Sequence, residues 1–155
     1  MKKLSRIASE GKIDVDASLT DRQSIIINAP IKEVWERLVD PGKWPSWHDQ
    51  INSVVVDPTD PKTFKWQQKG RRITSSFEYL TAPTGLSWTA KSGWTQSIYL
   101  WTLDATEEDQ TIVTVQQSYQ GLLLFLFVSH RKMHNDLLHW LDQLKQVAET
   151  DSTLV

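Results

Sequence analysis

The chain contains four histidines, and the spacing of two of them is one that can hold a metal ion. His130 and His134 lie four residues apart in a segment with a helical pattern, so their side chains share one helix face. Arg131 stands where the zinc-protease motif H-E-x-x-H requires glutamate, and His139 projects about 140° further round the helix. We therefore predict no metal site, and nothing else in the sequence indicates a cofactor.

His130 also falls on the apolar stripe of this helical segment, together with Met133. A histidine on such a stripe either lines a cavity, where a partner sets its pKa and tautomer, or is a core or exposed residue with satisfied hydrogen bonds. Both alternatives stay open from the sequence. We include His130, Met133 and His134 among the candidate ligand-binding residues.

Acid–base catalysis would require a positioned proton donor or acceptor. No spacing in the sequence forces two suitable side chains together, so we assign no catalytic residue. The side chains available for such a role are His48, His130, His134, Tyr79, Tyr99 and Tyr119.

Eight tryptophans in 155 residues are the unusual feature of the composition. Each indole is large, and its ring N–H needs a hydrogen-bond partner when it is buried. Alternation along the strand-like segments places most of the large rings on one sheet face. Such a face indicates either bulky core packing or an aromatic-lined pocket. The candidate pocket residues on it are Trp66, Phe77, Tyr79, Trp88, Tyr99, Trp101 and Tyr119.

Gln117 has the same parity as Val113, Val115 and Tyr119, which puts an amide on an otherwise apolar face. That amide must find hydrogen-bond partners, either in a bound ligand or in water and backbone near the strand end. We therefore add Gln117 to the candidate ligand-binding residues.

The order of the elements predicts an α+β protein. A strand at 24–29 precedes a helix that begins at Pro30, and a short helical turn follows at 43–50. Turn signals separate six more strands, which favours an antiparallel meander, and a long helical pattern covers 122–149. The six strands are predicted at 54–57, 63–68, 72–80, 86–91, 96–105 and 111–119, and the inward face of 96–105 is ambiguous.

Two segments have several interpretations. Lys69, Arg71 and Arg72 surround a glycine turn, and we interpret these cations as a solvated hairpin tip. The apolar run 122–128 opens the long helical pattern. It fits a second cavity wall, an oligomer contact or a membrane-touching patch, and the sequence does not choose among them.

Composition excludes several classes of protein. The net charge of −2 gives no electrostatic basis for binding nucleic acid, and the absence of cysteine excludes disulfides and thiolate sites. No apolar run approaches the ~20 residues that span a bilayer, and the N-terminus does not have the pattern of a secretory signal. We predict one cytoplasmic domain without integral membrane association, monomeric or weakly dimeric, with an N-terminal extension at 1–21, a core at 22–149 and a tail at 150–155.

Three stretches resemble one known family: Ile27 to Trp35 with the following Trp44-Pro45-Ser46-Trp47, Trp101 to Gly121, and the terminal helix ending at Glu149. Over about residues 22–149 the chain resembles the START-like SRPBCC superfamily, in particular its polyketide cyclase/dehydrase-type members. The resemblance implies a helix-grip fold. In that fold, a curved antiparallel sheet of about seven strands wraps around a long C-terminal helix, and two short helices follow the first strand.

The same resemblance implies a cavity between the sheet and the C-terminal helix. It places the segment 44–48 at one end of that cavity, where we expect Trp44 to act as a plug and Trp47 to line the mouth. The family has no universal catalytic residue, so none is carried over to this chain.

The expected function is to bind or carry an apolar or aromatic small molecule, such as a lipid, a polyketide or an isoprenoid-like compound. Two alternatives stay open. One is an aromatase/cyclase or dehydratase that acts on a polyketide-like substrate. The other is a protein-interaction module, such as a chaperone activator or a toxin–antitoxin-like partner, which would have a filled core and an exposed apolar patch.

Overall fold

A seven-stranded antiparallel sheet forms the body of the structure, a computed structural model that describes residues 2–122, 124–126 and 128–153. The strands are β1 (Leu19–Ile27), β2 (Ile51–Val56), β3 (Thr63–Gln68), β4 (Arg71–Thr81), β5 (Gly85–Ser92), β6 (Thr95–Ala105) and β7 (Thr111–Gly121). Their order across the sheet is β1-β7-β6-β5-β4-β3-β2, so the predicted meander is confirmed and β1 joins its far side.

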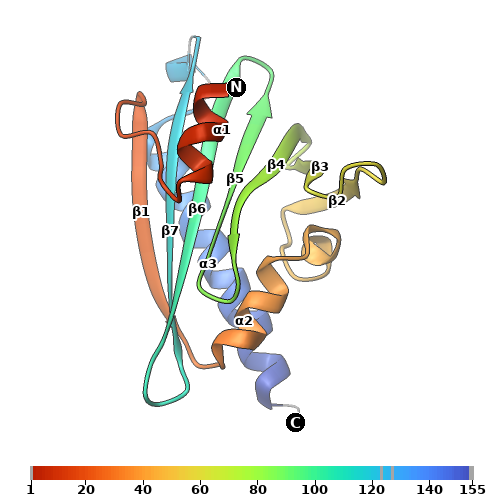
Figure 1. Ribbon diagram of the computed structural model, residues 1–155, viewed down its shortest axis with the longest axis vertical. Coiled ribbons are helices and arrows are strands. Elements are labelled where there is room, and N and C mark those ends of the chain that lie inside the picture. Colours follow the sequence, from red (N-terminus) through yellow and green to blue (C-terminus); the bar gives the residue numbers. More distant parts are fainter. Residues whose placement is uncertain (1, 123, 127, 154–155) are drawn as a thin grey trace.

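The helical segments connect the strands and pack against the sheet. They are α1 (Lys2–Ser9), α2 (Ile31–Leu38), the 3-10 turns η1 (Pro41–Ser46) and η2 (Leu124–Leu126), and α3 (His130–Thr153). Because β1 and β2 lie at opposite edges, α2 and η1 carry the chain across one end of the sheet, and α2 packs on α3. This arrangement confirms the predicted helix-grip fold (Figure 1).

Helix α3 begins at His130, so the predicted start at residue 122 is wrong. Gly121 ends β7 with a φ of 155°, and the backbone N–H of Lys132 donates to the hydroxyl of Ser129 at 3.2 Å. Ser129 therefore caps the helix and sets its first turn. Leu122 and Leu126 are exposed, and residues 123 and 127 of the predicted apolar run lie outside the described residues.

Helix α1 covers the opposite face of the sheet from α3 (Figure 1). Leu4 and Ala8 pack on Ile98 of β6, and the hydroxyl of Ser87 donates to the carbonyl of Ala8 at 2.8 Å. The sequence did not predict this helix within the expected N-terminal extension. The sheet is thus covered on both faces, and this explains why its outward-facing Ser87 is fully buried.

The inward face of β6, ambiguous in the sequence, is the one that carries Tyr99 and Trp101. Both rings lie near Trp140 of α3, at centroid distances of 6.4 and 5.7 Å. Ile98 and Leu100, with the opposite parity, face the side covered by α1. Register then places Gln117 beside Tyr99 on the face that α3 covers.

A cluster of tryptophans fills the space between the sheet and the middle of α3. Trp140 of α3 is fully buried. The indole centroids of its neighbours Trp44, Trp47, Trp66, Trp88 and Trp101 lie 5.1 to 6.0 Å from its own. Phe77 packs on the same cluster, with its ring centroid 6.1 Å from that of Trp88. At these positions the structure has core packing and no aromatic-lined pocket.

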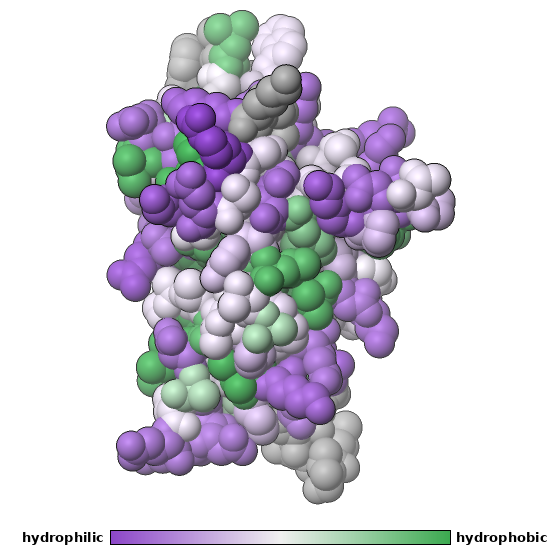
Figure 2. Space-filling view, viewed as in Figure 1, coloured by the Kyte–Doolittle hydropathy of each residue, from purple (hydrophilic) through white to green (hydrophobic). Residues whose placement is uncertain are grey.

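The surface that carries α1 is mostly hydrophilic, and its hydrophobic atoms gather in small separate patches (Figure 2). None of the described helices combines the length and the apolarity that a membrane span requires.

We predict that Trp140→Ala lowers the free energy of unfolding by about 3–5 kcal/mol, because it leaves a cavity at the centre of the indole cluster. Urea unfolding followed by circular dichroism measures this. The control Leu138→Ala removes an exposed side chain of the same helix and should change stability by less than about 0.5 kcal/mol. Equal losses in the two variants would contradict a core centred on Trp140.

Candidate functional site

A cavity of about 660 Å³ lies between the sheet and the N-terminal half of α3, beyond the tryptophan cluster. Its position follows from the sequence of the inward-facing pairs along β6 and β7, which are Trp101↔Val115, then Tyr99↔Gln117, then Ser97↔Tyr119. The inward face therefore changes from apolar to polar toward the end of the hairpin. The inward face of α3 divides at the same level. Trp140 belongs to the core, whereas Asp136 and Met133, which precede it in the helix, line the cavity.

A half-buried polar group in the cavity wall centres on Asp136. Its Oδ1 accepts a hydrogen bond from Gln68 Nε2 at 2.6 Å, and its Oδ2 lies 3.5 Å from the hydroxyl of Tyr99, which donates. Burial raises the pKa of the Asp136 carboxyl. Burial, and next the Asp136 carboxylate, raise the pKa of the Tyr99 phenol well above 10, so Tyr99 keeps its proton and acts as a donor.

Gln117 is 1% exposed, and its Nε2 has no acceptor at hydrogen-bond geometry in the described part of the chain, although its side chain lies close enough to the Tyr99 hydroxyl to lower the pKa of that phenol. A buried amide without a partner costs free energy comparable to a lost hydrogen bond. The side chain lines the cavity, so a bound molecule or water there can satisfy it. Both readings of Gln117 from the sequence, a ligand anchor and an amide satisfied by water, fit this geometry.

Three exposed cations, Lys69, Arg71 and Lys132, line the rim of the cavity. The Arg71 guanidinium lies 5.9 Å from the centroid of the Tyr119 ring, a cation–π distance. Lys69 and Arg71 do lie at a solvated hairpin tip, as the sequence indicated. The tip also forms part of the cavity entrance, which the sequence could not show.

Four of the candidate ligand-binding residues line the cavity: Tyr99, Gln117, Tyr119 and Met133. Five other candidate ligand-binding residues belong to the core cluster: Trp47, Trp66, Phe77, Trp88 and Trp101. Trp44 is fully buried there, and Trp47 is packed against Trp140. The structure therefore places the expected mouth residue Trp47 in the core.

Tyr79 lies on the face that α1 covers, away from the cavity. A register shift between Phe77 and Tyr79 pairs Tyr79 with Ser87, whereas Phe77 pairs with Trp88. One extra residue in a strand reverses the faces of all later side chains, and the simple alternation read from the sequence missed this bulge. The Tyr79 ring packs beside Gly11 and Gly85.

His130 and His134 lie at the edge strand β1, outside the cavity lining. The Nδ1 atom of His134 is 3.2 Å from Asp21 Oδ2, and the Nε2 atom of His130 is 3.9 Å from Asp21 Oδ1. The stripe of Met133, Leu137 and Trp140 faces the sheet, so the helix turns these two histidines toward β1.

Sequence reasoning missed Asp136, Gln68 and His139, which also line the cavity. Asp136 had a detectable signal. It lies three residues after Met133 and four before Trp140, so it shares the buried helix face with them. Gln68 and His139 had no such signal, because their roles depend on contacts between distant segments.

Of the described residues, His48, Asp49 and His139 form the group whose ligand atoms could hold a metal ion. His139 lines the cavity, and its Nε2 lies 2.6 Å from Asp49 Oδ1. Burial, and next the neighbouring His139, lower the pKa of His48 to about 4, so His48 is neutral at pH 7. Its Nδ1 accepts a hydrogen bond from the backbone N–H of Gln50 at 3.3 Å.

We predict that Asp136→Asn raises the thermal midpoint by a few degrees at pH 7 but not at pH 3. Burial raises the pKa of the Asp136 carboxyl in the folded state above its value in the unfolded chain. The protonated carboxyl therefore contributes stability that is fully present below the unfolded pKa and is lost as the pH rises through the folded pKa. The neutral amide avoids this loss. Calorimetry at both pH values measures the difference.

The control for this experiment is Asp142→Asn, which changes an exposed carboxyl on the same helix. It should leave the midpoint within about 1 °C at pH 7. A lower midpoint for Asp136→Asn at pH 7 would mean that the Asp136 charge stabilises the fold.

The family described as "Polyketide cyclase / dehydrase and lipid transport" matches residues 19–149. No curated protein sequence matches the chain.

Several solved structures share the fold. The hypothetical protein jhp0584 from Helicobacter pylori has a TM-score of 0.75 at 16% identity, over 86% of this chain and 90% of that one. A START superfamily protein from Mycobacterium smegmatis has a TM-score of 0.71 at 12% identity, over 84% and 97%. The Zhui aromatase/cyclase from Streptomyces sp. R1128 has a TM-score of 0.72 at 12% identity, over 84% and 93%.

These identities show a common fold and leave activity open. The family match covers the whole sheet and most of α3, including the strands and the helix that build the cavity. The resemblance inferred from the sequence motifs is thereby confirmed, and the chain belongs to the polyketide cyclase/dehydrase and lipid-transport family, with a START-like fold.

Proposed function

We propose that this protein binds a small amphipathic organic molecule, such as a lipid, a polyketide or an isoprenoid-like compound with a polar group. The observation that carries the proposal is the cavity of about 660 Å³, with the buried and unpartnered Nε2 of Gln117 in its wall. Small-molecule sites in proteins typically have volumes of about 300–1,000 Å³.

The cavity wall is suited to a molecule with two kinds of surface. Val128, Met133 and the ring of Tyr119 supply apolar contacts. Gln117 supplies a hydrogen-bond donor, its Nε2, that is held in place by the sheet, and the Tyr99 hydroxyl, which donates to Asp136, can still accept a hydrogen bond. A ligand would gain from its polar group only if it satisfied the Gln117 donor, so the site selects for a matching acceptor.

The proposal modifies the expectation of a purely apolar or aromatic ligand. Most of the rings expected in the wall pack on Trp140, and the space left open is the polar end of the sheet. Membership of a lipid-transport and cyclase family and the fold shared with a START superfamily protein support a binding role.

Native mass spectrometry of freshly purified protein, compared with its denatured mass, tests the proposal. We expect a co-purifying organic mass that is lost on denaturation. In Gln117→Leu its affinity, measured with the identified compound, should fall about three- to tenfold, the equivalent of one hydrogen bond.

Gln116→Leu is the matched control, because Gln116 neighbours Gln117 in β7 but faces the side that α1 covers. It should bind as the wild type does. Equal affinity in Gln117→Leu and Gln116→Leu would exclude Gln117 as the anchor.

A second candidate function is that of an aromatase/cyclase or dehydratase, which we also carry as a proposal. The observation that favours it is the Asp136 carboxyl with its raised pKa, beside the Tyr99 hydroxyl in the cavity wall. A carboxyl with a raised pKa holds its proton more tightly than a free one and is a candidate to exchange a proton with a bound substrate.

This candidate predicts that a linear poly-β-ketone thioester is converted with loss of water, which mass spectrometry of the products detects. Asp136→Asn should then lower kcat by about 10²–10⁴-fold. The exposed-site variant Asp142→Asn should keep full turnover. Turnover by Asp136→Asn at the wild-type rate would remove Asp136 from the mechanism.

A further inference from the structure

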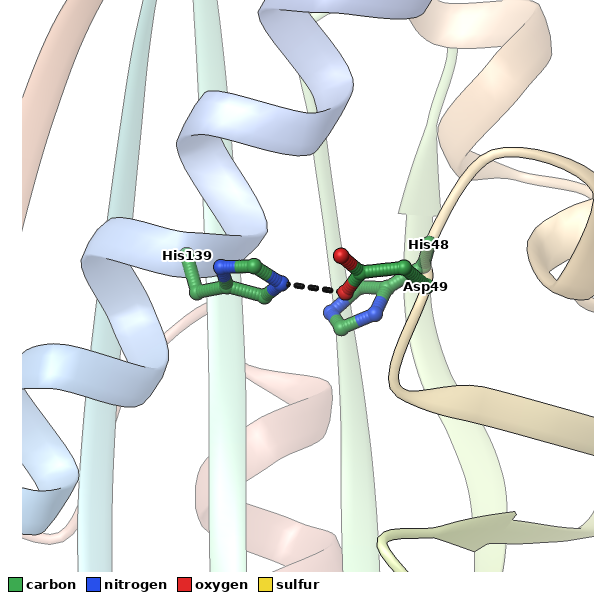
Figure 3. A group of neighbouring side chains, drawn as sticks. All are labelled: His48, Asp49 and His139. Atoms are coloured by element: carbon green, nitrogen blue, oxygen red, sulfur yellow. Dashed lines mark hydrogen bonds and ion pairs between the residues drawn. The ribbon is translucent and has the colours of Figure 1, made fainter.

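Three potential metal ligands converge beside the cavity from segments far apart in the sequence. His48 and Asp49 lie in the loop between η1 and β2, and His139 lies on α3. One ligand atom from each lies within 4.8 Å of the other two. Figure 3 shows His139 reaching from α3 toward Asp49, with the His48 ring beside the carboxylate.

His48 supplies an independent observation. Its side chain is completely buried, and its Nε2 has no hydrogen-bond partner among the described residues. Its ring centroid is 4.4 Å from that of Trp140 and 5.3 Å from that of His139. A buried ring nitrogen without a partner is costly in a well-packed core, so its presence beside two other ligands requires an explanation.

We propose that His48, Asp49 and His139 form a binding site for a divalent transition-metal ion of the zinc class. Two imidazole nitrogens and one carboxylate oxygen are the donors that zinc accepts, whereas Mg²⁺ and Ca²⁺ prefer oxygen donors alone. Because His139 also lines the cavity, an ion held by the three ligands would lie beside the cavity.

The geometry requires only small movements. The three ligand atoms already lie within 4.8 Å of one another, close to the separations of ligand atoms that each lie about 2.0–2.2 Å from one zinc ion. Asp49 and His139 are already in contact at 2.6 Å and must part to admit the ion. The Asp49 side chain is 66% exposed, which leaves it free to rotate.

Loading the site also changes the hydrogen bond of His48. If Nε2 binds the ion, the proton of the neutral ring moves to Nδ1 and faces the backbone N–H of Gln50. If Nδ1 binds the ion, it displaces that N–H. Either way the 3.3 Å bond from Gln50 is lost, so the Gln50 amide reports on occupancy.

The sequence-based prediction of no metal concerned the pair His130 and His134. The proposed site uses neither of them, since both face Asp21 at the sheet edge. That pair therefore provides a control with the same residue types on the same helix.

The experiment is a titration of chelator-treated, full-length protein with Zn²⁺ by calorimetry and with Co²⁺ by visible absorption. We expect one ion per chain, the intense visible bands of low-coordinate Co²⁺, and a shift of the Gln50 amide resonance. Mg²⁺ should give no binding at the same concentrations.

Asp49→Asn and His139→Ala should each weaken Zn²⁺ binding by at least about 100-fold, because each removes a direct ligand. His134→Ala should bind as the wild type does. Circular dichroism confirms that each variant is folded. Absence of stoichiometric Zn²⁺ and Co²⁺ binding, or a loss in His134→Ala that equals the loss in His139→Ala, would overturn the proposal.

Discussion

The packing of Trp140 against the inward face of the sheet is the interaction on which the rest of the structure depends. Five indoles surround this side chain, and together they fill the space beneath the middle of α3. Dense packing of this kind leaves few voids. It also leaves the ring N–H groups of Trp47, Trp88, Trp101 and Trp140 without a hydrogen-bond partner among the described residues. The position of α3 on the sheet is therefore set by its tryptophan, and the cavity is confined to the end where the rings stop.

The chemistry of the cavity follows from that division. Beyond the indoles, the same strands present Tyr99 and Gln117, and the same helix presents Asp136. Burial away from water raises the pKa of the Asp136 carboxyl and of the Tyr99 phenol. The apolar core thus both supports the polar site and tunes its protonation.

The family match and the neighbouring structures agree with this architecture, in which one fold hosts carriers and cyclases. The cavity of this chain has a polar wall and a cationic rim, and a histidine–aspartate pair lies beside it. The side chains that line the cavity decide function in this fold, because the sheet and the helix supply only the backbone that encloses it.

Much of the fold was predictable from the sequence. Each of the seven strands was predicted, although the predicted strand at 24–29 covers only the second half of β1, and parity placed Gln117 on the inward face. These properties are local, since each strand's pattern records which face is buried. The start of α3 was missed, although the capping side chain of Ser129 marks it.

The residues that line the site were harder to predict from the sequence. The tryptophans were visible in the sequence, but whether they line a cavity or fill it depends on how Trp140 meets them across the fold. One bulge moved Tyr79 to the other face, and His139 meets Asp49 across 90 residues of chain. Local pattern records burial, whereas contacts between distant segments depend on the angle and register at which the helix meets the sheet.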